Sequence, residues 1–285
     1  MKEDRSTKGL AMRQHGVADF ARTQLLFTDK LLQRGADEWL AEARTHLEAG
    51  CYPEAIDACN AALDRQPSAA AYYLSGRARG LLKDLADALE DFGEALRLDP
   101  NYVAAYLERG CLYYEQEQYE QAVADFTDAL LIDPTLARAH YLRGYARQDL
   151  RNFGGAIADF TRVLELDAEH ADAWYNRGFA RYDLEDYRGA IADFTEALRL
   201  RPYDLTAYAG RGEARYHLGH LRGAIADFSV LLKADPEAAN AYYNRGVAYY
   251  DLRNYVAALS DLERAQTLGH PGAAPAIQQM RAALQ

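Results

Sequence analysis

The sequence predicts an all-α fold, a right-handed superhelical solenoid of antiparallel helix hairpins with an extra helix at each end. Glycine recurs at steps of 34 residues from Gly76 to Gly246, and phenylalanine keeps the same step from Phe92 to Phe228. Proline follows most copies of the pattern and cannot continue a helix. A unit that recurs at such a period buries its apolar faces by stacking on its neighbours.

The unit is clearest at 171–204, which reads ADAWYNRGFARYDLEDYRGAIADFTEALRLRPYD. It contains two amphipathic helix patterns separated by a short polar turn. Gly178 and Ala190 are small where the two helices must approach closely, and this leaves room for Trp174 and Phe194 beside them. Each unit is therefore expected to be one helix hairpin.

Seven such units are predicted within residues 36–272, and both ends of the chain depart from the repeat. Residues 1–35 are interpreted as an N-terminal tail with a capping helix from Val17 to Arg34, and residues 273–285 as a C-terminal capping helix. Polar-backed caps cover the open ends of a repeat array. The units are expected to begin near residues 36, 69, 103, 137, 171, 205 and 239.

Composition and motifs argue against several classes of function. A net charge of -11 disfavours nucleic acid, and no apolar run is long enough to span a bilayer. The three cysteines have no metal or redox spacing, which fits a cytoplasmic protein. No phosphate-binding loop, nucleophile elbow or zinc motif occurs, so neither an enzyme nor a cofactor is expected.

The repeat resembles the tetratricopeptide repeat family, whose pattern runs W-x2-L-G-x2-Y, A-x3-F, P. The resemblance covers roughly residues 36–272. The copies differ from the family in placing arginine before the glycine, where leucine is usual. The family landmarks of the best copy are Trp174, Gly178, Tyr187, Ala190, Phe194 and Pro202.

Two further columns carry opposite charges: the arginine before each glycine, and the aspartate before each phenylalanine. The second unit has Ser75 in the arginine column, and the first has Ala58 in the aspartate column. Pairing each arginine with the aspartate of the preceding hairpin avoids a mismatch at these two positions. The predicted pairs are Asp91–Arg109, Asp125–Arg143, Asp159–Arg177, Asp193–Arg211 and Asp227–Arg245.

The resemblance implies that the first helix of each unit lines a binding groove. Acids outnumber bases on the columns that this places in the groove, and the alternative for each ring there is packing against a neighbouring hairpin. Cations bind well on tyrosine faces, which favours a basic peptide. The predicted partner-binding residues are Tyr141, Tyr145, Tyr175, Asn176, Phe179, Tyr182, Tyr216, Tyr243, Asn244 and Tyr250.

The sequence therefore predicts a non-enzymatic scaffold that binds a protein or peptide in an acidic, tyrosine-rich groove. No lysine occurs on the groove columns, which disfavours a clamp for the C-terminal carboxylate of a chaperone. The alternative is a structural protein that self-associates through its terminal helices or convex faces. No nucleic acid, membrane, metal or cofactor partner is expected.

Overall fold

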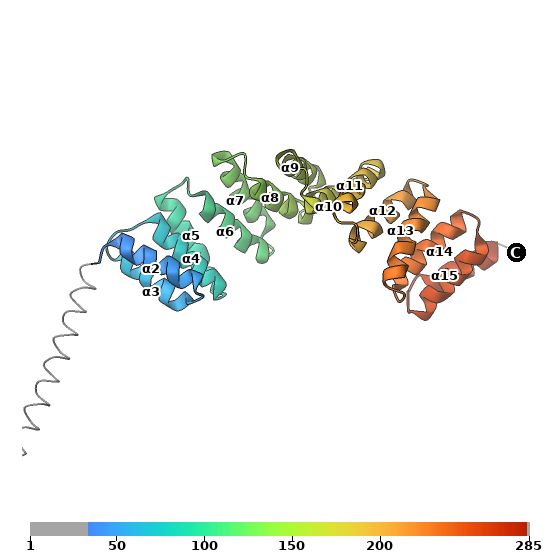
Figure 1. Ribbon diagram of the computed structural model, residues 1–285, viewed down its shortest axis with the longest axis horizontal. Coiled ribbons are helices and arrows are strands. Elements are labelled where there is room, and N and C mark those ends of the chain that lie inside the picture. The colour runs from blue at the N-terminus through green and yellow to red at the C-terminus, as the bar shows by residue number, and fades with distance from the viewer. Residues whose placement is uncertain (1–33, 284–285) are drawn as a thin grey trace, which may run out of the picture. The chain divides into compact units, whose positions relative to one another are not determined.

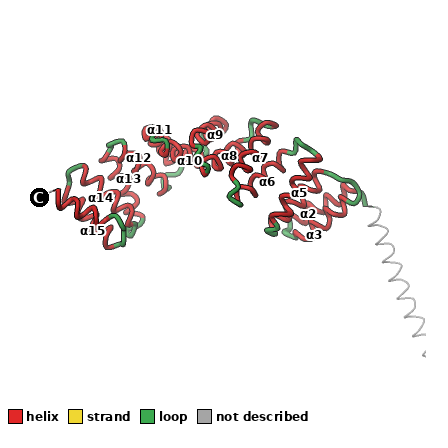
Figure 2. Tube along the Cα trace, turned by 180° about the vertical axis from the view of Figure 1, so that it is seen from behind, coloured by secondary structure: helices red, strands yellow, loops and turns green. Residues whose placement is uncertain are grey.

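The computed structural model describes residues 34–283, which contain fifteen helices and no strand (Figures 1 and 2). The capping helix predicted from Val17 to Arg34 lies almost entirely outside the described residues. The chain divides into two compact units, residues 1–112 and 113–285, and each is described by itself. Helices joined by short loops make up both (Figure 2). The fold is an all-α solenoid of helix hairpins.

Five helices begin in the first unit: α2 (Ala36–Glu48), α3 (Tyr52–Leu63), α4 (Ala69–Leu81), α5 (Leu85–Leu98) and α6 (Val103–Glu115). The last residues of α6 belong to the second unit, which continues with α7 (Tyr119–Ile132), α8 (Ala137–Asp149), α9 (Phe153–Leu166), α10 (Ala171–Asp183) and α11 (Tyr187–Leu200). It ends with α12 (Leu205–His217), α13 (Leu221–Ala234), α14 (Ala239–Asp251), α15 (Tyr255–Thr267) and α16 (Ala273–Ala283). Within each unit, consecutive hairpins lie side by side (Figure 1).

The turn inside each hairpin depends on one residue with a positive φ. Glycine fills this position at Gly50 and Gly219, with φ of 77° and 79°, whereas Glu185 adopts it at 61°. The next residue, Asp186, caps the start of α11, where its side chain accepts a hydrogen bond from the backbone N–H of Gly189 at 3.0 Å.

The two helices of a hairpin meet at the repeated glycine. A Cβ on Gly178 would lie 3.1 Å from Cδ1 of Phe194, and Phe194 is only 1% exposed. The same Cβ would lie 3.2 Å from Cβ of Asp193. The glycine therefore lets the ring and the aspartate of the second helix lie directly against the first helix.

The aspartate beside this contact binds two arginines of its own hairpin. In the hairpin of α10 and α11, Arg177 and Arg181 each contact the Asp193 carboxylate at 2.8 Å. Arg177 also donates to the hydroxyl of Thr161, on the preceding hairpin, at 3.0 Å. The same arrangement recurs as Arg143, Arg147, Asp159 and Thr127, and as Arg211, Arg215, Asp227 and Thr195.

The predicted pairing of each arginine with the preceding hairpin is therefore wrong for Asp159, Asp193 and Asp227. Each of these carboxylates lies against the first helix of its own hairpin because the glycine there has no side chain. The Nη1 atom of each first arginine instead reaches the preceding hairpin, where it donates a hydrogen bond to a threonine hydroxyl. The guanidinium thus joins three helices at one point.

The hairpin of α4 and α5 in the first unit has a weaker version of this cluster. Ser75 replaces the first arginine, and Arg79 is the remaining cation, 3.3 Å from Asp91. Burial raises the pKa of Asp91, and the hydrogen bond from Ser75 and the charge of Arg79 lower it only partly. The carboxylate that lacks one arginine is thus less well stabilised in its charged form.

The last helix, α16, packs on α15 through an apolar stripe. Ile277 and Met280 are 6% and 3% exposed, and Arg281 reaches back to Glu263 at 3.1 Å.

Candidate partner-binding face

The ten residues predicted to bind a partner lie on α8, α10, α12 and α14, all in the second unit. The tyrosines and Phe179 on α8, α10 and α14 are spaced three, four or seven residues apart, which places them on one helical face, and Asn176 and Asn244 directly follow Tyr175 and Tyr243. We call this surface the first-helix face. The structure distributes its side chains between two clusters and a few exposed rings.

The first cluster surrounds Tyr141. Its ring lies 5.9 Å from that of Tyr145 and 5.8 Å from that of Phe160, centroid to centroid. Asn176, which is 5% exposed, donates from Nδ2 to the hydroxyl of Tyr141 at 3.0 Å. Burial raises the pKa of Tyr141 to about 12. Asn176 and Tyr141 therefore hold adjacent hairpins together, and Asn176 offers little of its surface to a partner.

The middle of the face carries the exposed rings. Phe179 is 39% exposed and Tyr145 is 40% exposed, which is unusual for large aromatic side chains in a folded protein. Tyr175 is half-buried, with its ring 5.6 Å from that of Phe194, and burial raises its pKa. Phe179 and Tyr145 therefore offer the most ring surface, and Tyr175 offers an edge.

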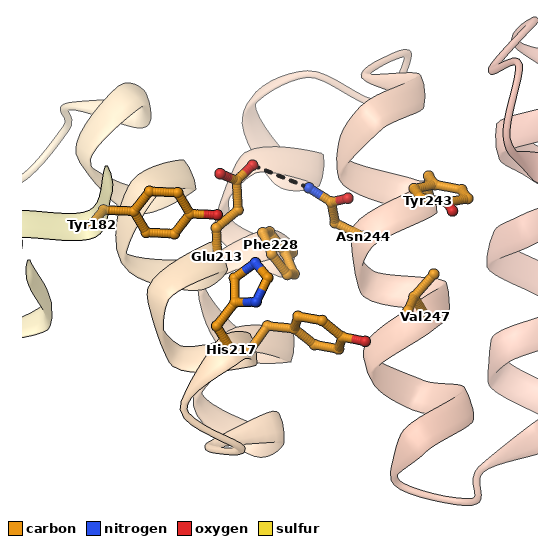
Figure 3. Close-up of a pocket in the computed structure, with 8 residues that line it drawn as sticks. Tyr182, Glu213, His217, Phe228, Tyr243, Asn244 and Val247 are labelled. Carbon is orange, nitrogen blue, oxygen red and sulfur yellow. Dashed lines mark hydrogen bonds between the residues drawn. The ribbon is translucent and has the colours of Figure 1, made fainter. Parts of the chain in front are cut away.

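The second cluster encloses a pocket of about 440 Å³, which Figure 3 shows. Four predicted residues, Tyr182, Tyr216, Tyr243 and Asn244, contribute to its wall. They come from three successive first helices, α10, α12 and α14. The remaining lining residues are Glu213, His217, Phe228 and Val247.

Glu213 is the acidic group of this pocket. Asn244 donates from Nδ2 to its Oε1 at 3.3 Å (Figure 3). Burial raises the pKa of Glu213, while the nearby His217 and the hydrogen bond from Asn244 lower it. Among the described residues no donor bonds the second carboxylate oxygen. A half-buried carboxylate of this kind favours a cationic ligand, which would stabilise its charged form.

Other acids of the face are already engaged by tyrosine hydroxyls. Tyr216 donates to Oδ2 of Asp251 at 2.7 Å, and Tyr114 donates to Asp149 in the same way three hairpins earlier. Burial and the bond to Asp251 raise the pKa of Tyr216 to about 12. These carboxylates keep the face negative, but they are less available to a partner than Glu213. Tyr250, the last predicted residue, packs on Tyr255 of its own hairpin at 5.7 Å.

Comparison with protein-family models gives matches along most of the repeat region. Models described as "Tetratricopeptide repeat" match residues 40–103, 92–124, 137–170, 171–204 and 210–275, and one described as "TPR repeat" matches 110–150. The chain belongs to the tetratricopeptide repeat family.

Solved structures of other tetratricopeptide proteins share this fold. YrrB, described as a TPR protein with an unusual peptide-binding site, is 26% identical; the match covers 67% of this chain and 99% of YrrB, with a TM-score of 0.61. Part of a TPR repeat-containing protein from Cytophaga hutchinsonii is 18% identical over 83% of this chain and 98% of that one, with a TM-score of 0.69. The latter similarity concerns the fold alone.

A curated human protein matches a short part of this tetratricopeptide chain. DnaJ homolog subfamily C member 7 from Homo sapiens is 43% identical over 51 residues, which is 18% of this chain. The match spans only 10% of the human protein's length. It therefore extends over little more than one repeat.

Four lining residues of the pocket were absent from the predicted site: Glu213, His217, Phe228 and Val247. His217 ends α12 and stacks on Tyr187, with centroids 5.0 Å apart and rings inclined by 13°. A signal for the pocket was available. The column of Tyr141, Tyr175 and Tyr243 is interrupted by alanine at residue 209.

Within residues 34–283 no helix is both long enough and apolar enough to cross a membrane. The same residues contain no group of three or more side chains suited to hold a metal ion.

Proposed function

We propose that this protein is a non-enzymatic, cytoplasmic scaffold that captures a segment of a partner protein on the first-helix face of its second unit, chiefly within residues 137–252. The observation that carries the proposal is the presence, on one face, of exposed rings and of a pocket with a half-buried acid. Phe179 and Tyr145 supply the exposed rings, and Glu213 supplies the acid. Exposed aromatic surface of this kind is typical of interaction sites.

The family supports this proposal at the level of its general function, since tetratricopeptide repeats bind proteins and peptides. YrrB, which is similar over two thirds of this chain, is described as having a peptide-binding site. The pattern of rings also suits a peptide, because tyrosine offers a large contact area with little side-chain entropy to lose.

The charge of the face favours a basic segment. The chain carries a net charge of -11, and Asp183, Glu213 and Asp251 lie on the helices that form the face. Cations bind to the faces of tyrosine and phenylalanine rings with up to about 2 kcal/mol when water is excluded. A segment with Lys or Arg would meet both rings and carboxylates here.

The test is retention of partner proteins from native lysate by the full chain. Tyr175→Ala combined with Tyr182→Ala is expected to abolish retention, because it removes ring surface at the centre of the face. Circular dichroism should show the helical content unchanged. Tyr203→Ala combined with Val256→Ala is the matched control, because these side chains are 93% and 84% exposed outside the face. Retention by the first variant equal to that of the control would rule the proposal out.

A further inference from the structure

The hairpin of α12 and α13 departs from the repeat on its binding face. In three described hairpins a tyrosine of the first helix packs on the repeated phenylalanine of the second: Tyr73 on Phe92 at 6.0 Å, Tyr141 on Phe160 at 5.8 Å and Tyr175 on Phe194 at 5.6 Å. The corresponding residue of α12 is Ala209. Among the described residues no ring packs on Phe228, which instead lines the pocket.

The same departure changes the role of an asparagine. Asn176 donates to the hydroxyl of Tyr141, which lies 35 residues before it in the sequence. The residue 35 positions before Asn244 is Ala209, which has no hydroxyl. Asn244 donates instead to Glu213. The absence of a tyrosine at this position therefore explains both the pocket on this hairpin and the hydrogen bond that orients the acid.

Glu213 is itself unique in its column. The residues at the corresponding position of the other repeats are Arg44, Arg77, Cys111, Tyr145, Phe179 and Val247. A feature that serves the stacking of repeats should recur with the repeat, as the Arg–Asp clusters do. An acid that occurs once, beside an alanine that also occurs once, is better explained by a role particular to this hairpin.

The core of the protein shows which group suits a carboxylate beside an aromatic ring. Arg177 bonds Asp193 while its guanidinium carbon lies 4.7 Å from the centroid of the Trp174 ring. Arg211 bonds Asp227 in the same way, 5.3 Å from the ring of Tyr208. The pocket offers a carboxylate and several rings in the same combination, without an arginine of its own among the lining residues.

We propose that the pocket between Glu213, Phe228 and Asn244 receives one arginine side chain of a partner polypeptide. The guanidinium would lie beside the tyrosine rings that line the pocket, in the space that a tyrosine at 209 would fill, and would bond the oxygen of Glu213 that Asn244 leaves available. Arginine suits this site better than lysine because its planar, weakly hydrated head both stacks on rings and pairs with carboxylates. This assignment rests on the proposed function and names the side chain that the face selects.

The probe is an acetylated and amidated pentapeptide, Gly-Gly-Arg-Gly-Gly, titrated into the full protein and followed by backbone NMR. Counterparts with citrulline, lysine or tyrosine in place of arginine test charge, shape and ring character separately. Shifts are expected at residues 213, 243, 244 and 247, with the citrulline peptide bound about tenfold more weakly or worse, a difference of about 1.4 kcal/mol. The lysine peptide is expected to bind between the two.

Two variants test the site without removing the fold. Ala209→Tyr restores the pattern of the neighbouring repeats and is expected to abolish the shifts, while Glu213→Gln is expected to weaken arginine binding about tenfold. Glu237→Gln makes the same charge change in an exposed turn and should bind as the wild type does. Helical content and the denaturation midpoint show whether each variant is folded.

Equal binding of the arginine and citrulline peptides would overturn the proposal, as would tighter binding of the tyrosine peptide or unchanged binding by Ala209→Tyr. The wider proposed function is judged separately by retention from lysate. If Ala209→Tyr retains the partner that Tyr175→Ala with Tyr182→Ala loses, the face binds a partner but the pocket does not select arginine. If Ala209→Tyr retains the partner as the wild type does, and Tyr175→Ala with Tyr182→Ala retains it as its control does, both proposals fail.

Discussion

The hairpin of α10 and α11 and the hairpin of α12 and α13 share a core but differ on the face that neighbours leave open. Both bury a phenylalanine to 1% exposure, Phe194 and Phe228, and both bind a buried aspartate with two arginines. On the open face, Tyr175 of the first corresponds to Ala209 of the second. In the first hairpin a tyrosine ring packs on the phenylalanine. In the second, the corresponding alanine has no ring, and a pocket lies on this face.

This difference separates two kinds of residue that a single repeat contains. Most residues that hold a hairpin to itself and to its neighbours recur with the repeat. Residues that are free to differ, such as Phe179 and its counterpart Glu213, give each hairpin its own surface. In this protein the departures from the repeat carry more information about binding than the repeat does.

The largest expected effect concerns what the two hairpins share. Asp193→Ala and Asp227→Ala each leave two arginines without their buried carboxylate, which should lower the free energy of unfolding by about 3–5 kcal/mol. Because the clusters are alike, the two losses should agree within about 1 kcal/mol. Urea denaturation measures both, with the exposed Asp183→Ala as control. A loss confined to one hairpin would show that the two cores are not equivalent.

A smaller effect is expected where the hairpins differ. Tyr175→Ala should uncover Phe194 and lower the free energy of unfolding by about 2 kcal/mol, less than for a fully buried ring because Tyr175 is half-buried. Ala209→Tyr should do the reverse in the other hairpin and add about 1 kcal/mol from the new aromatic pair. Denaturation midpoints test this pair of changes. If both variants are less stable than the wild type, a tyrosine at residue 209 does not form the stabilising aromatic pair that is expected here.

The smallest effect concerns pH and Glu213. Because burial raises the pKa of Glu213 above its ordinary value of 4.5, the folded state binds a proton more readily than the unfolded state does. Its contribution to stability is therefore fully present below about pH 4.5 and is lost as pH rises through the raised pKa. Arginine binding should change in the opposite direction, because it needs the charged carboxylate. The titratable groups around it are Tyr182, Tyr216, His217 and Tyr243.

Glu213→Gln removes this carboxylate, so the measurement is the difference in denaturation midpoint between wild type and variant from pH 4 to 8. The difference should turn in favour of the variant as pH rises. A difference independent of pH would mean that Glu213 titrates alike in the folded and unfolded states.

The repeat period was enough to predict the fold from sequence, because a hairpin that recurs needs the same small and large residues at the same positions. Gly178 and Phe194 are examples, and they meet as expected. The partner of each aspartate could not be predicted in this way. Asp193 has an arginine of the column 16 residues before it, Arg177 in its own hairpin, and another 18 residues after it, Arg211 in the next, and two spacings so similar do not decide between them.

The site was harder to predict because its members have two roles. Tyr141 and Asn176 recur on the groove columns, yet they bond each other across two hairpins and stabilise the stack. The pocket depends on the absence of a ring at Ala209, whereas a prediction from the groove columns favours positions that carry aromatic rings. A search for interruptions in each column would have found both Ala209 and Glu213.

The crystal structure of the Ala209→Tyr variant tests most directly whether one residue decides between a closed face and a pocket. The new ring should pack on Phe228, as Tyr175 packs on Phe194, and its hydroxyl should accept a hydrogen bond from Asn244. The pocket of about 440 Å³ should be filled. A ring that points into solvent, with Asn244 still bonded to Glu213 and the pocket open, would contradict this account.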